Sequence, residues 1–257
     1  MVTTVILAGG LGTRFGTETA SRPKPLIEVG GRPVVWHIMK LYAHHGVRDF
    51  ILCAGYRGDA IAEFFIGYRQ RYGDVEVDLG SGTVHVLRPP AEDWRVKVID
   101  TGPLTQTGGR IKRLAALIAA DEFFLLAYGD TLSDVDVSGS IAYHRAHGRL
   151  ATMSVVSPPS RFGRAVVEDG VITEFREKQA AAELQLNAGF FVLSPRVLDY
   201  IEGDDTVWEQ APLERLATDR QLMAWRHDGF WQPMDTPVER DTLNRLWQSG
   251  RAPWKLW

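Results

Sequence analysis

The first part of the chain alternates short apolar runs with amphipathic stretches. Val5-Ile6-Leu7 is an apolar run that ends at glycines, which is typical of a buried strand leading into a loop. Apolar residues then recur at helical spacing over 33–45, where Pro33 suits a first helical position. We expect a strand over 50–54 and an amphipathic helix over 59–68. This alternation predicts a parallel sheet covered by helices.

The middle of the chain adds a small excursion and then the most apolar strand. Residues 75–79 and 83–87 alternate with period two on either side of a Gly-Ser-Gly turn, which predicts a hairpin. A helix is expected over 110–120. The strongly apolar segment 123–128 is expected to be a central strand of the sheet.

The last part of the chain has a more mixed pattern. After a predicted helix over 138–147, short helices separate four predicted strands, at 151–156, 164–167, 171–175 and 189–193. No repeat and no Pro/Gly/Ser-rich linker divides the 257 residues. The sequence therefore predicts one α/β domain with a Rossmann-like, mixed but mostly parallel sheet, flanked by helices and carrying small β excursions.

Composition narrows the class of protein. Hydrophobic residues make up 45% and charged residues 24% of the chain, the balance of an ordinary globular protein. The net charge of -3 gives no general attraction for nucleic acid. Cys53 is the single cysteine, so no intrachain disulfide can form. The first residues carry no basic segment before their short apolar run, so we expect neither a signal peptide nor a membrane span there, and a cytoplasmic protein.

A glycine-rich turn, AGGLGTRFG at 8–16, directly follows the first predicted strand. Such a turn presents backbone N–H groups to an anion, and nucleotide phosphate is the obvious guest, although a tight structural turn has the same composition. The dinucleotide fingerprint needs a glycine where Phe15 stands, and no Gly-Lys-Ser/Thr closes a P-loop. The turn thus indicates phosphate binding outside both common motifs.

Two cations accompany this turn. Lys24 lies between Pro23 and Pro25, which restrict its backbone and suit an ammonium that must sit at a fixed point. Arg14 can bind phosphate oxygens as a fork, whereas a lysine acts as a point charge. The pair predicts a polyphosphate whose charge shifts during reaction.

The sequence LAGGLGTRF followed by RPKPLIEVG resembles the signature of the sugar-nucleotide pyrophosphorylases. These enzymes join a nucleoside triphosphate and a sugar 1-phosphate and release pyrophosphate. The likeness runs nearly end to end, and the segments GFWQPMDT and APWKLW resemble the cytidylyl branch, which uses CTP and glucose 1-phosphate. The resemblance implies in-line attack on the α-phosphorus of CTP with Arg14 and Lys24 as catalytic residues, giving CDP-glucose.

The resemblance also implies a set of nucleotide-binding residues, with a nucleotide half over about 1–130. They are Leu7, Ala8, Gly9, Gly10, Gly12, Thr13, Arg14, Lys24, Thr105, Gly109, Arg110, Gly129 and Asp130. Gly108 and Gly109 would let the chain approach a flat base. Without the resemblance, this stretch is better interpreted as a loop before a helix, with Arg110, Lys112 and Arg113 on its solvated face.

Asp130 follows the strongest predicted strand, at the end where ligands of parallel sheets bind. A carboxylate there can hold Mg²⁺, which commonly takes one or two protein carboxylates and fills its other positions with phosphate oxygens and water. A helix-capping aspartate would look the same. Asp235 is the second metal ligand, which the resemblance alone supplies.

For the sugar phosphate, the resemblance implies Glu177, Lys178, Asn187 and Gly189, in a second half over about 131–257 that also serves oligomerisation. Gln179 and Ala188 depart from the family pattern, and the Ala188 methyl would either narrow the pocket or be harmless. The family's habit implies a closed homo-oligomer, a hexamer in the cytidylyl branch.

Other interpretations stay open at this point. The same chemistry with UTP or another sugar 1-phosphate, an NAD(P)-dependent oxidoreductase, and a catalytically silent nucleotide sensor are the rivals. His144 and His147 could bind a metal, but a solvated helix face is the simpler interpretation. Six of the eight tryptophans fall at or after Trp208, which suits either core packing or a subunit interface.

Overall fold

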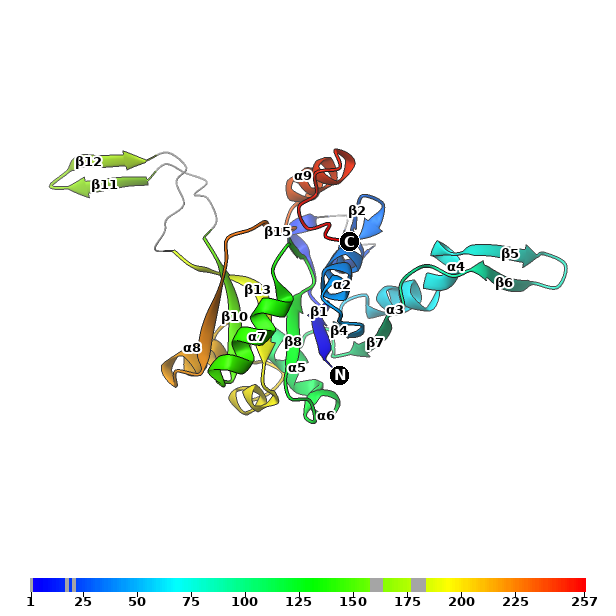
Figure 1. Cartoon of the computed structure of the whole chain (residues 1–257), viewed down its shortest axis with the longest axis horizontal. Helices are drawn as coiled ribbons and strands as arrows, with labels where there is room; N and C mark the ends of the chain where they lie inside the picture. Colours follow the sequence, from blue (N-terminus) through cyan, green and yellow to red (C-terminus); the bar gives the residue numbers. More distant parts are fainter. Residues whose placement is uncertain (1, 17–18, 20–21, 158–163, 177–183) are drawn as a thin grey trace.

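The computed structural model describes residues 2–16, 19, 22–157, 164–176 and 184–257, and a seven-stranded sheet forms its centre (Figure 1). The strand order is β14-β10-β13-β8-β1-β4-β7. In chain order, the strands are β1 Thr3–Leu7, β4 Asp49–Ala54, β7 Arg95–Asp100, β8 Phe124–Tyr128, β10 Ala151–Val156, β13 Leu186–Leu193 and β14 Leu222–His227. Only β13 is antiparallel to its neighbours β10 and β8. The predicted mixed, mostly parallel sheet is confirmed.

Helices cover both faces of this sheet because successive strand residues point to opposite sides. Ile6 and Leu125 contribute to one core, and Val5 and Leu126 to the other. The first core is closed by α2 Val34–His44, α3 Gly58–Ile66 and α7 Val137–His147. The second is closed by α5 Thr107–Arg113, α6 Ala115–Ile118 and α8 Ala211–Thr218. In the described part of the chain, no helix is both long and apolar enough to cross a bilayer.

Small β pairs decorate the sheet. The predicted hairpin is β5 Asp74–Asp78 with β6 Thr83–Arg88, which projects from the body of the molecule (Figure 1). The predicted strands 164–167 and 171–175 pair as β11 Arg164–Glu168 and β12 Val171–Arg176. Two shorter pairs were not predicted: β2 Glu28–Val29 with β3 Arg32–Pro33, and β9 Thr131–Ser133 with β15 Trp231–Pro233.

Some predicted boundaries were wrong. The stretch 59–68 forms α3 and a separate α4 (Tyr68–Tyr72), joined through Gly67. The predicted helix 110–120 begins at Thr107 and breaks at Leu114, so Gly108 and Gly109 lie inside α5 rather than before it. The two outer strands β7 and β14 and the helix α9 (Pro237–Gln248) were missed. Outer strands bury less side chain, so their apolar signal is weaker.

His144 and His147 do not lie on a solvated face of α7. His144 is 6% exposed, and its Nδ1 lies 2.9 Å from Thr152 Oγ1 on β10. His147 Nε2 lies 2.7 Å from the same hydroxyl. No group of three metal-ligating side chains exists among the described residues. Both histidines therefore fasten α7 to the sheet.

The late tryptophans pack within the chain. Trp208 is fully buried in the second core, and Trp254 is 1% exposed in the first. Trp254 Nε1 donates to His37 Nδ1 at 3.3 Å, which leaves the His37 proton on Nε2, 2.8 Å from the Val29 carbonyl that accepts it. Core packing thus accounts for Trp208 and Trp254, and the C-terminal segment is tied to α2 through a neutral histidine.

We expect the free energy of unfolding to fall as the pH drops from 6.5 toward 4. Burial lowers the pKa of His37 to about 4. In this window the unfolded chain binds a proton at His37 that the folded chain does not, so stability is lost on acidification, by about 3 kcal/mol at full extent. His144, whose pKa burial lowers to about 4, adds to the same slope. Denaturant titrations at pH 7 and pH 4.5 measure the loss.

The variant His37→Gln isolates the His37 contribution, with His85→Gln on exposed β6 as its control. The slope of the free energy of unfolding against pH should become shallower in His37→Gln, by the equivalent of up to one bound proton. The slope should stay unchanged in His85→Gln. Equal slopes in wild type and His37→Gln would contradict the assignment.

Candidate active site

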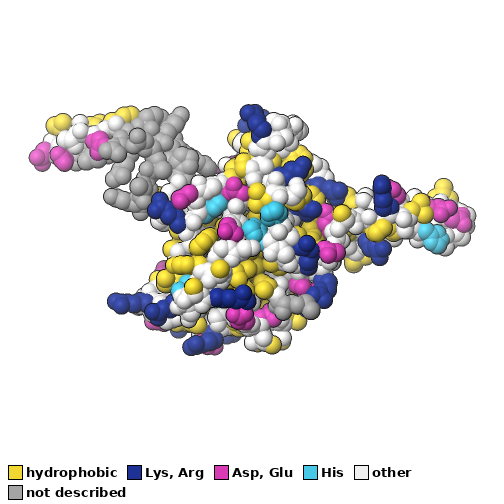
Figure 2. Space-filling view, viewed as in Figure 1, with side chains coloured by type: hydrophobic (Ala, Val, Ile, Leu, Met, Phe, Trp, Pro, Cys, Tyr) yellow, Lys and Arg dark blue, Asp and Glu magenta, His cyan; other side chains and the backbone are white. Residues whose placement is uncertain are grey.

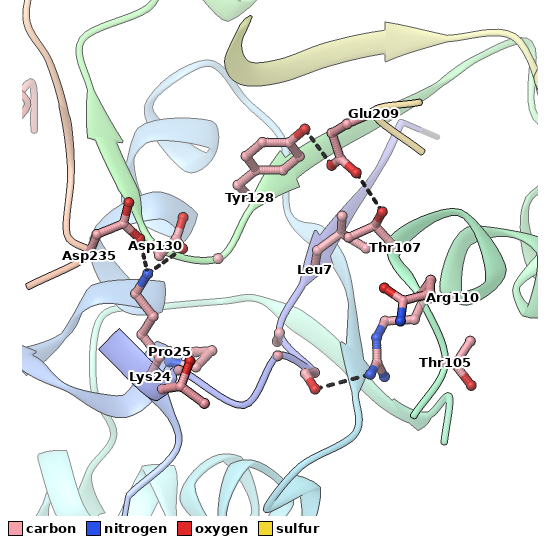
Figure 3. Close-up of a pocket in the computed structure, with 17 residues that line it drawn as sticks. Leu7, Lys24, Pro25, Thr105, Thr107, Arg110, Tyr128, Asp130, Glu209 and Asp235 are labelled. Carbon is pink, nitrogen blue, oxygen red and sulfur yellow. Dashed lines mark hydrogen bonds and ion pairs between the residues drawn. The ribbon is translucent and has the colours of Figure 1, made fainter. Parts of the chain in front are cut away.

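A cavity of about 390 Å³ opens at the carboxyl ends of β1 and β8 (Figure 3). It gathers eleven of the predicted nucleotide-binding residues together with Asp235. Its lining consists of Leu7, Ala8, Gly9, Gly10, Gly12, Thr13, Lys24, Pro25, Thr105, Gln106, Thr107, Arg110, Tyr128, Gly129, Asp130, Glu209 and Asp235. Residues far apart in sequence therefore meet where ligands of parallel sheets are bound.

The glycine turn leaves β1 and passes along this cavity. Gly12 has φ of 62°, a left-handed conformation that favours glycine, and precedes a 3₁₀ turn over Thr13–Phe15. Phe15 is 3% exposed and packs in the first core, which gives the position after Arg14 an anchoring role in place of a third glycine. The side chain of Arg14 lies outside the described part of the structure.

Arg110 supports the turn from behind. It is 5% exposed, so the interpretation that placed it on a solvated helix face was wrong. Its guanidinium donates to the Gly9 carbonyl at 3.0 Å, to the carbonyls of Ala54 and Gly102 at 3.1 and 2.8 Å, and to Thr101 Oγ1 at 2.7 Å. Burial lowers the pKa of Arg110. A cation with four acceptors fixes the backbone of the turn and adds positive charge to the cavity wall.

Replacing Gly9 by alanine should destabilise the turn. The new Cβ would lie 2.2 Å from Arg110 Nη1, so the guanidinium must move and lose its bond to Gly9. We expect a loss on the order of 1–3 kcal/mol in the free energy of unfolding. Gly10→Ala is the matched control, because a Cβ there meets nothing within 4 Å. Equal stability of the two variants, measured by denaturant unfolding, would refute the support assigned to Arg110.

The paired glycines of α5 have a packing role. A Cβ at Gly108 would lie 2.7 Å from the Thr206 carbonyl oxygen, and one at Gly109 would lie 2.5 Å from the Asp204 oxygen. The Gly109 N–H also donates to the Thr206 carbonyl at 3.2 Å. These contacts explain both glycines without a base, and Gly109 is not among the residues that line the cavity.

Lys24 is held as its flanking prolines predict. Lys24–Leu26 form a 3₁₀ turn in which Pro25 and Leu26 are buried. The Ile27 N–H donates to the Lys24 carbonyl at 3.0 Å and closes the turn. The Lys24 side chain is 11% exposed, and its Nζ lies 2.6 Å from both Asp130 Oδ2 and Asp235 Oδ1. We call these three residues the acid–lysine cluster.

Local structure brings the two aspartates of this cluster together. Asp130 directly precedes β9, and β15 pairs antiparallel with β9 so that Pro233 faces Thr131. The Met234 N–H donates to the Asp130 carbonyl at 2.8 Å. Thr236 and Glu239 then form a capping box that starts α9, and Glu239 also accepts from the Asp235 N–H at 2.8 Å. The N-terminus of α9 therefore fixes Asp235.

The donor set of the acid–lysine cluster fits Mg²⁺. Its two carboxylates converge on one point, and their side chains keep 29% and 23% exposure, which leaves room for further oxygen ligands. Two carboxylates are what Mg²⁺ commonly takes from a protein when phosphate supplies the rest. The helix-cap interpretation of Asp130 was wrong, because a strand follows it and its carboxylate binds Lys24.

A further wall of the cavity was missed by the sequence analysis. The Glu209 carboxylate accepts from Tyr128 Oη through Oε1 and from Thr107 Oγ1 through Oε2, each at 2.6 Å (Figure 3). We call Thr107, Tyr128 and Glu209 the Glu209 group. Its members come from α5, β8 and the segment before α8, and only the folded sheet brings them together.

The structure describes only some of the residues that were predicted to bind the sugar phosphate. Glu177, Lys178 and Gln179 lie outside the described residues. Asn187 Nδ2 donates to Tyr128 Oη at 2.9 Å, and its Oδ1 accepts from the Gly189 N–H at 2.8 Å; Asn187 therefore contacts the cavity through Tyr128, and neither residue is among those that line it. The Ala188 side chain is 2% exposed in the first core, so its methyl does not narrow this cavity.

Comparisons with known proteins find a matching family model and similar curated proteins. The family model described as "Nucleotidyl transferase" matches residues 3–224. A glucose-1-phosphate cytidylyltransferase of Salmonella typhi is 47% identical over 253 residues, covering 98% of each chain. A Bacillus subtilis protein named "Probable glucose-1-phosphate cytidylyltransferase" is 42% identical and covers 98% of this chain and 99% of its own.

Solved structures agree in fold. HddC from Yersinia pseudotuberculosis, complexed with GMP-PN, superposes with a TM-score of 0.69 at 22% identity, over 96% of this chain and 100% of its own. An apo UDP-glucose pyrophosphorylase has the same TM-score at 14% identity, over 98% of this chain and 100% of its own.

Proposed function

Since this chain belongs to the nucleotidyl transferase family, we propose that it makes CDP-glucose and pyrophosphate from CTP and α-D-glucose 1-phosphate. The observation that carries the chemistry is the convergence of the acid–lysine cluster beside the glycine turn, in one cavity. The choice of substrates rests on the likeness to glucose-1-phosphate cytidylyltransferases over nearly the whole chain.

In the proposed reaction, a phosphate oxygen of glucose 1-phosphate attacks the α-phosphorus of CTP in line. The bond from the α-phosphorus to the bridging oxygen breaks, and pyrophosphate leaves with that electron pair. The protein needs no covalent step, so its contribution is positioning and charge stabilisation. The glycine turn, with Arg14, would hold the β- and γ-phosphates, and Lys24 would stabilise the charge that develops around the α-phosphate.

Asp130 and Asp235 are the residues that would hold Mg²⁺. When bound, the ion neutralises phosphate charge and aligns the reacting groups. The Lys24 ammonium lies between these carboxylates, so Lys24 must turn away from them as the nucleotide enters. Triphosphate oxygens are the new acceptors that the ammonium would find in the cavity.

The same arrangement suggests which residues would bind the nucleoside and which would bind the sugar phosphate. Thr105 and Arg110 would face the nucleoside, on the opposite side of the cavity from the acid–lysine cluster (Figure 3). Glu177, Lys178, Asn187 and Gly189 would serve the glucose 1-phosphate. In this proposal the nucleotide half covers about 1–130 and the sugar half about 131–257 of one domain.

A product assay tests the proposal. Purified protein with Mg²⁺ is incubated with each of the four nucleoside triphosphates and with several hexose 1-phosphates, and pyrophosphate and sugar nucleotide are quantified. CTP with glucose 1-phosphate should give the fastest turnover. Faster turnover with UTP or another sugar would reassign the substrates. CTP binding without product would favour a silent sensor, and NAD(P)H binding would favour the oxidoreductase.

The proposal extends to a homo-oligomer that works in the cytoplasm. The projecting β5–β6 hairpin exposes apolar side chains that a monomer would leave in water (Figure 2). Leu79 is 91% and Leu87 is 65% exposed. Such surfaces commonly mark protein–protein contacts, which supports self-association through this hairpin. The single buried Cys53 suits a reducing compartment.

A further inference from the structure

Glu209 is a carboxylate in the cavity wall that the proposed reaction leaves without a role. It is half-buried, it precedes the N-cap residue Gln210 of α8, and it lines the same cavity as the acid–lysine cluster. Unlike Asp130 and Asp235, it forms no ion pair among the described residues. Its negative charge therefore disfavours phosphate beside it and suits an uncharged, hydrogen-bond-donating part of the substrates.

The orientation of Glu209 is fixed from both sides. Tyr128 and Thr107 each donate to one carboxylate oxygen at 2.6 Å, a short distance typical of charge-assisted bonds. Tyr128 is held in turn by Asn187, and Thr107 accepts from the Trp208 N–H at 2.9 Å. Burial and the Glu209 charge raise the pKa of Tyr128, so its hydroxyl stays a donor. A side chain held in this way is preorganised for a ligand.

The remaining acceptor capacity defines the ligand. A carboxylate offers about four lone-pair sites, two on each oxygen, and the Glu209 group uses one on each. One site per oxygen is left, at the spacing of the carboxylate itself. Two hydroxyls on adjacent carbons of a sugar ring present two donors at a comparable spacing.

The position of Glu209 points to a sugar ring. Figure 3 shows Tyr128 and Glu209 along the upper edge of the cavity, with the acid–lysine cluster below them on one side and Thr105 and Arg110 below them on the other. A ring next to the phosphates would lie at this place. Both substrates of the proposed function carry one there: the ribose of CTP and the hexose of glucose 1-phosphate.

We propose that Glu209 binds a vicinal diol of a substrate sugar ring and thereby sets specificity for the hydroxylated ring. This inference rests on the proposed function, and it adds a residue that recognises a neutral part of the substrates. Sites that hydrogen-bond a hydroxyl discriminate strongly against analogues that lack it. Tyr128 and Thr107 act through Glu209 and are positioning residues.

The test compares wild type with Glu209→Gln on intact and deoxygenated substrates. The intact pair is CTP with glucose 1-phosphate, and the analogues are 2′-deoxy-CTP, 3′-deoxy-CTP, 2-deoxyglucose 1-phosphate and 3-deoxyglucose 1-phosphate. With the intact pair, kcat/KM should fall about 10–100-fold in Glu209→Gln. With each analogue that lacks one hydroxyl of the bound diol, the fall in kcat/KM caused by Glu209→Gln should be several-fold smaller than with the intact pair, because wild type has already lost one of the two bonds.

Controls separate binding from folding. The ratio between substrates within one variant does not depend on the folded fraction, so partial unfolding of Glu209→Gln does not mask the result. Glu214→Gln, on the exposed side of α8, is the matched control and should behave as wild type. In Tyr128→Phe, kcat/KM should depend on the substrate hydroxyl in the same way, but the fall with the intact pair should be smaller.

The outcomes assign the ring or overturn the inference. A Glu209→Gln penalty that shrinks with the deoxy-CTP analogues assigns the ribose, and one that shrinks with the deoxyglucose 1-phosphates assigns the hexose. The same penalty with every analogue, or no penalty, would mean that Glu209 only joins β8 to α5, which overturns the inference while wild-type turnover upholds the proposed function. No product from wild type with any pair would overturn both.

Discussion

Replacing Lys24 by methionine should lower kcat by roughly 10²–10³-fold, the loss expected when one preorganised charge donor is removed from a transition state. The Lys24 ammonium lies between the two carboxylates of the acid–lysine cluster, and the flanking Pro23 and Pro25 restrict the Lys24 backbone. Methionine keeps most of the side-chain volume but removes the ammonium. Pyrophosphate release under saturating substrates measures the effect.

Folding should change far less than turnover in this variant. Two carboxylates would lose a shared counterion, at a cost on the order of 1–3 kcal/mol in the free energy of unfolding. Lys112→Met is the matched control, because the partly buried Lys112 ammonium lies away from the cavity lining and donates to the Leu198 carbonyl at 2.7 Å. Turnover of Lys24→Met within a few-fold of wild type would remove Lys24 from the proposed mechanism.

Replacing Asp235 by asparagine should lower kcat/KM by roughly 10²–10³-fold and raise the Mg²⁺ concentration that gives half-maximal rate. Asparagine keeps the shape but removes one of the two negative charges that would hold the ion. It also leaves the capping box intact, because the box joins Thr236 to Glu239, and the additional bond from Asp235 to Glu239 is donated by the Asp235 backbone N–H. A magnesium titration of the initial rate measures both effects.

The control for this change is Asp136→Asn. Asp136 caps α7 by accepting from the Gly139 N–H at 2.9 Å, and asparagine caps helices about as well. Asp136→Asn should therefore keep both the rate and the magnesium requirement. An Asp235→Asn enzyme with an unchanged magnesium requirement would show that Asp235 is not a ligand.

The part of the site that could be predicted from sequence is the part encoded locally. The turn after β1 and the proline-flanked Lys24 carry their signals within a few residues, and the structure places both at the cavity. Asp130 was found because it closely follows the most apolar strand. Local chain chemistry was enough for these residues.

The rest depends on pairings between distant segments. Asp235 meets Asp130 only through the β9–β15 register, although Thr236-Pro237 with Glu239 is a capping-box signal that could have located α9. Arg110 looked solvated because α5 reads as a charged helix, and its burial follows from four acceptors spread over three segments.

Glu209 carried no recognisable local signal. Its partners Thr107 and Tyr128 are about a hundred and about eighty residues away, and its orientation exists only in the folded sheet. Periodicity finds the elements that carry such residues but not the contacts between their ends. The packing role of the paired glycines of α5 was missed for the same reason, since their close neighbour is a distant backbone segment.

The central claim is that a triphosphate lies along the turn between Leu7 and Thr13, with Lys24 on its phosphates. A crystal structure with CTP and Mg²⁺ tests it most directly. The account predicts phosphate oxygens against this turn, the Lys24 ammonium bound to them, and the metal between Asp130 and Asp235. A triphosphate bound elsewhere, with Lys24 still between the two carboxylates, would contradict it.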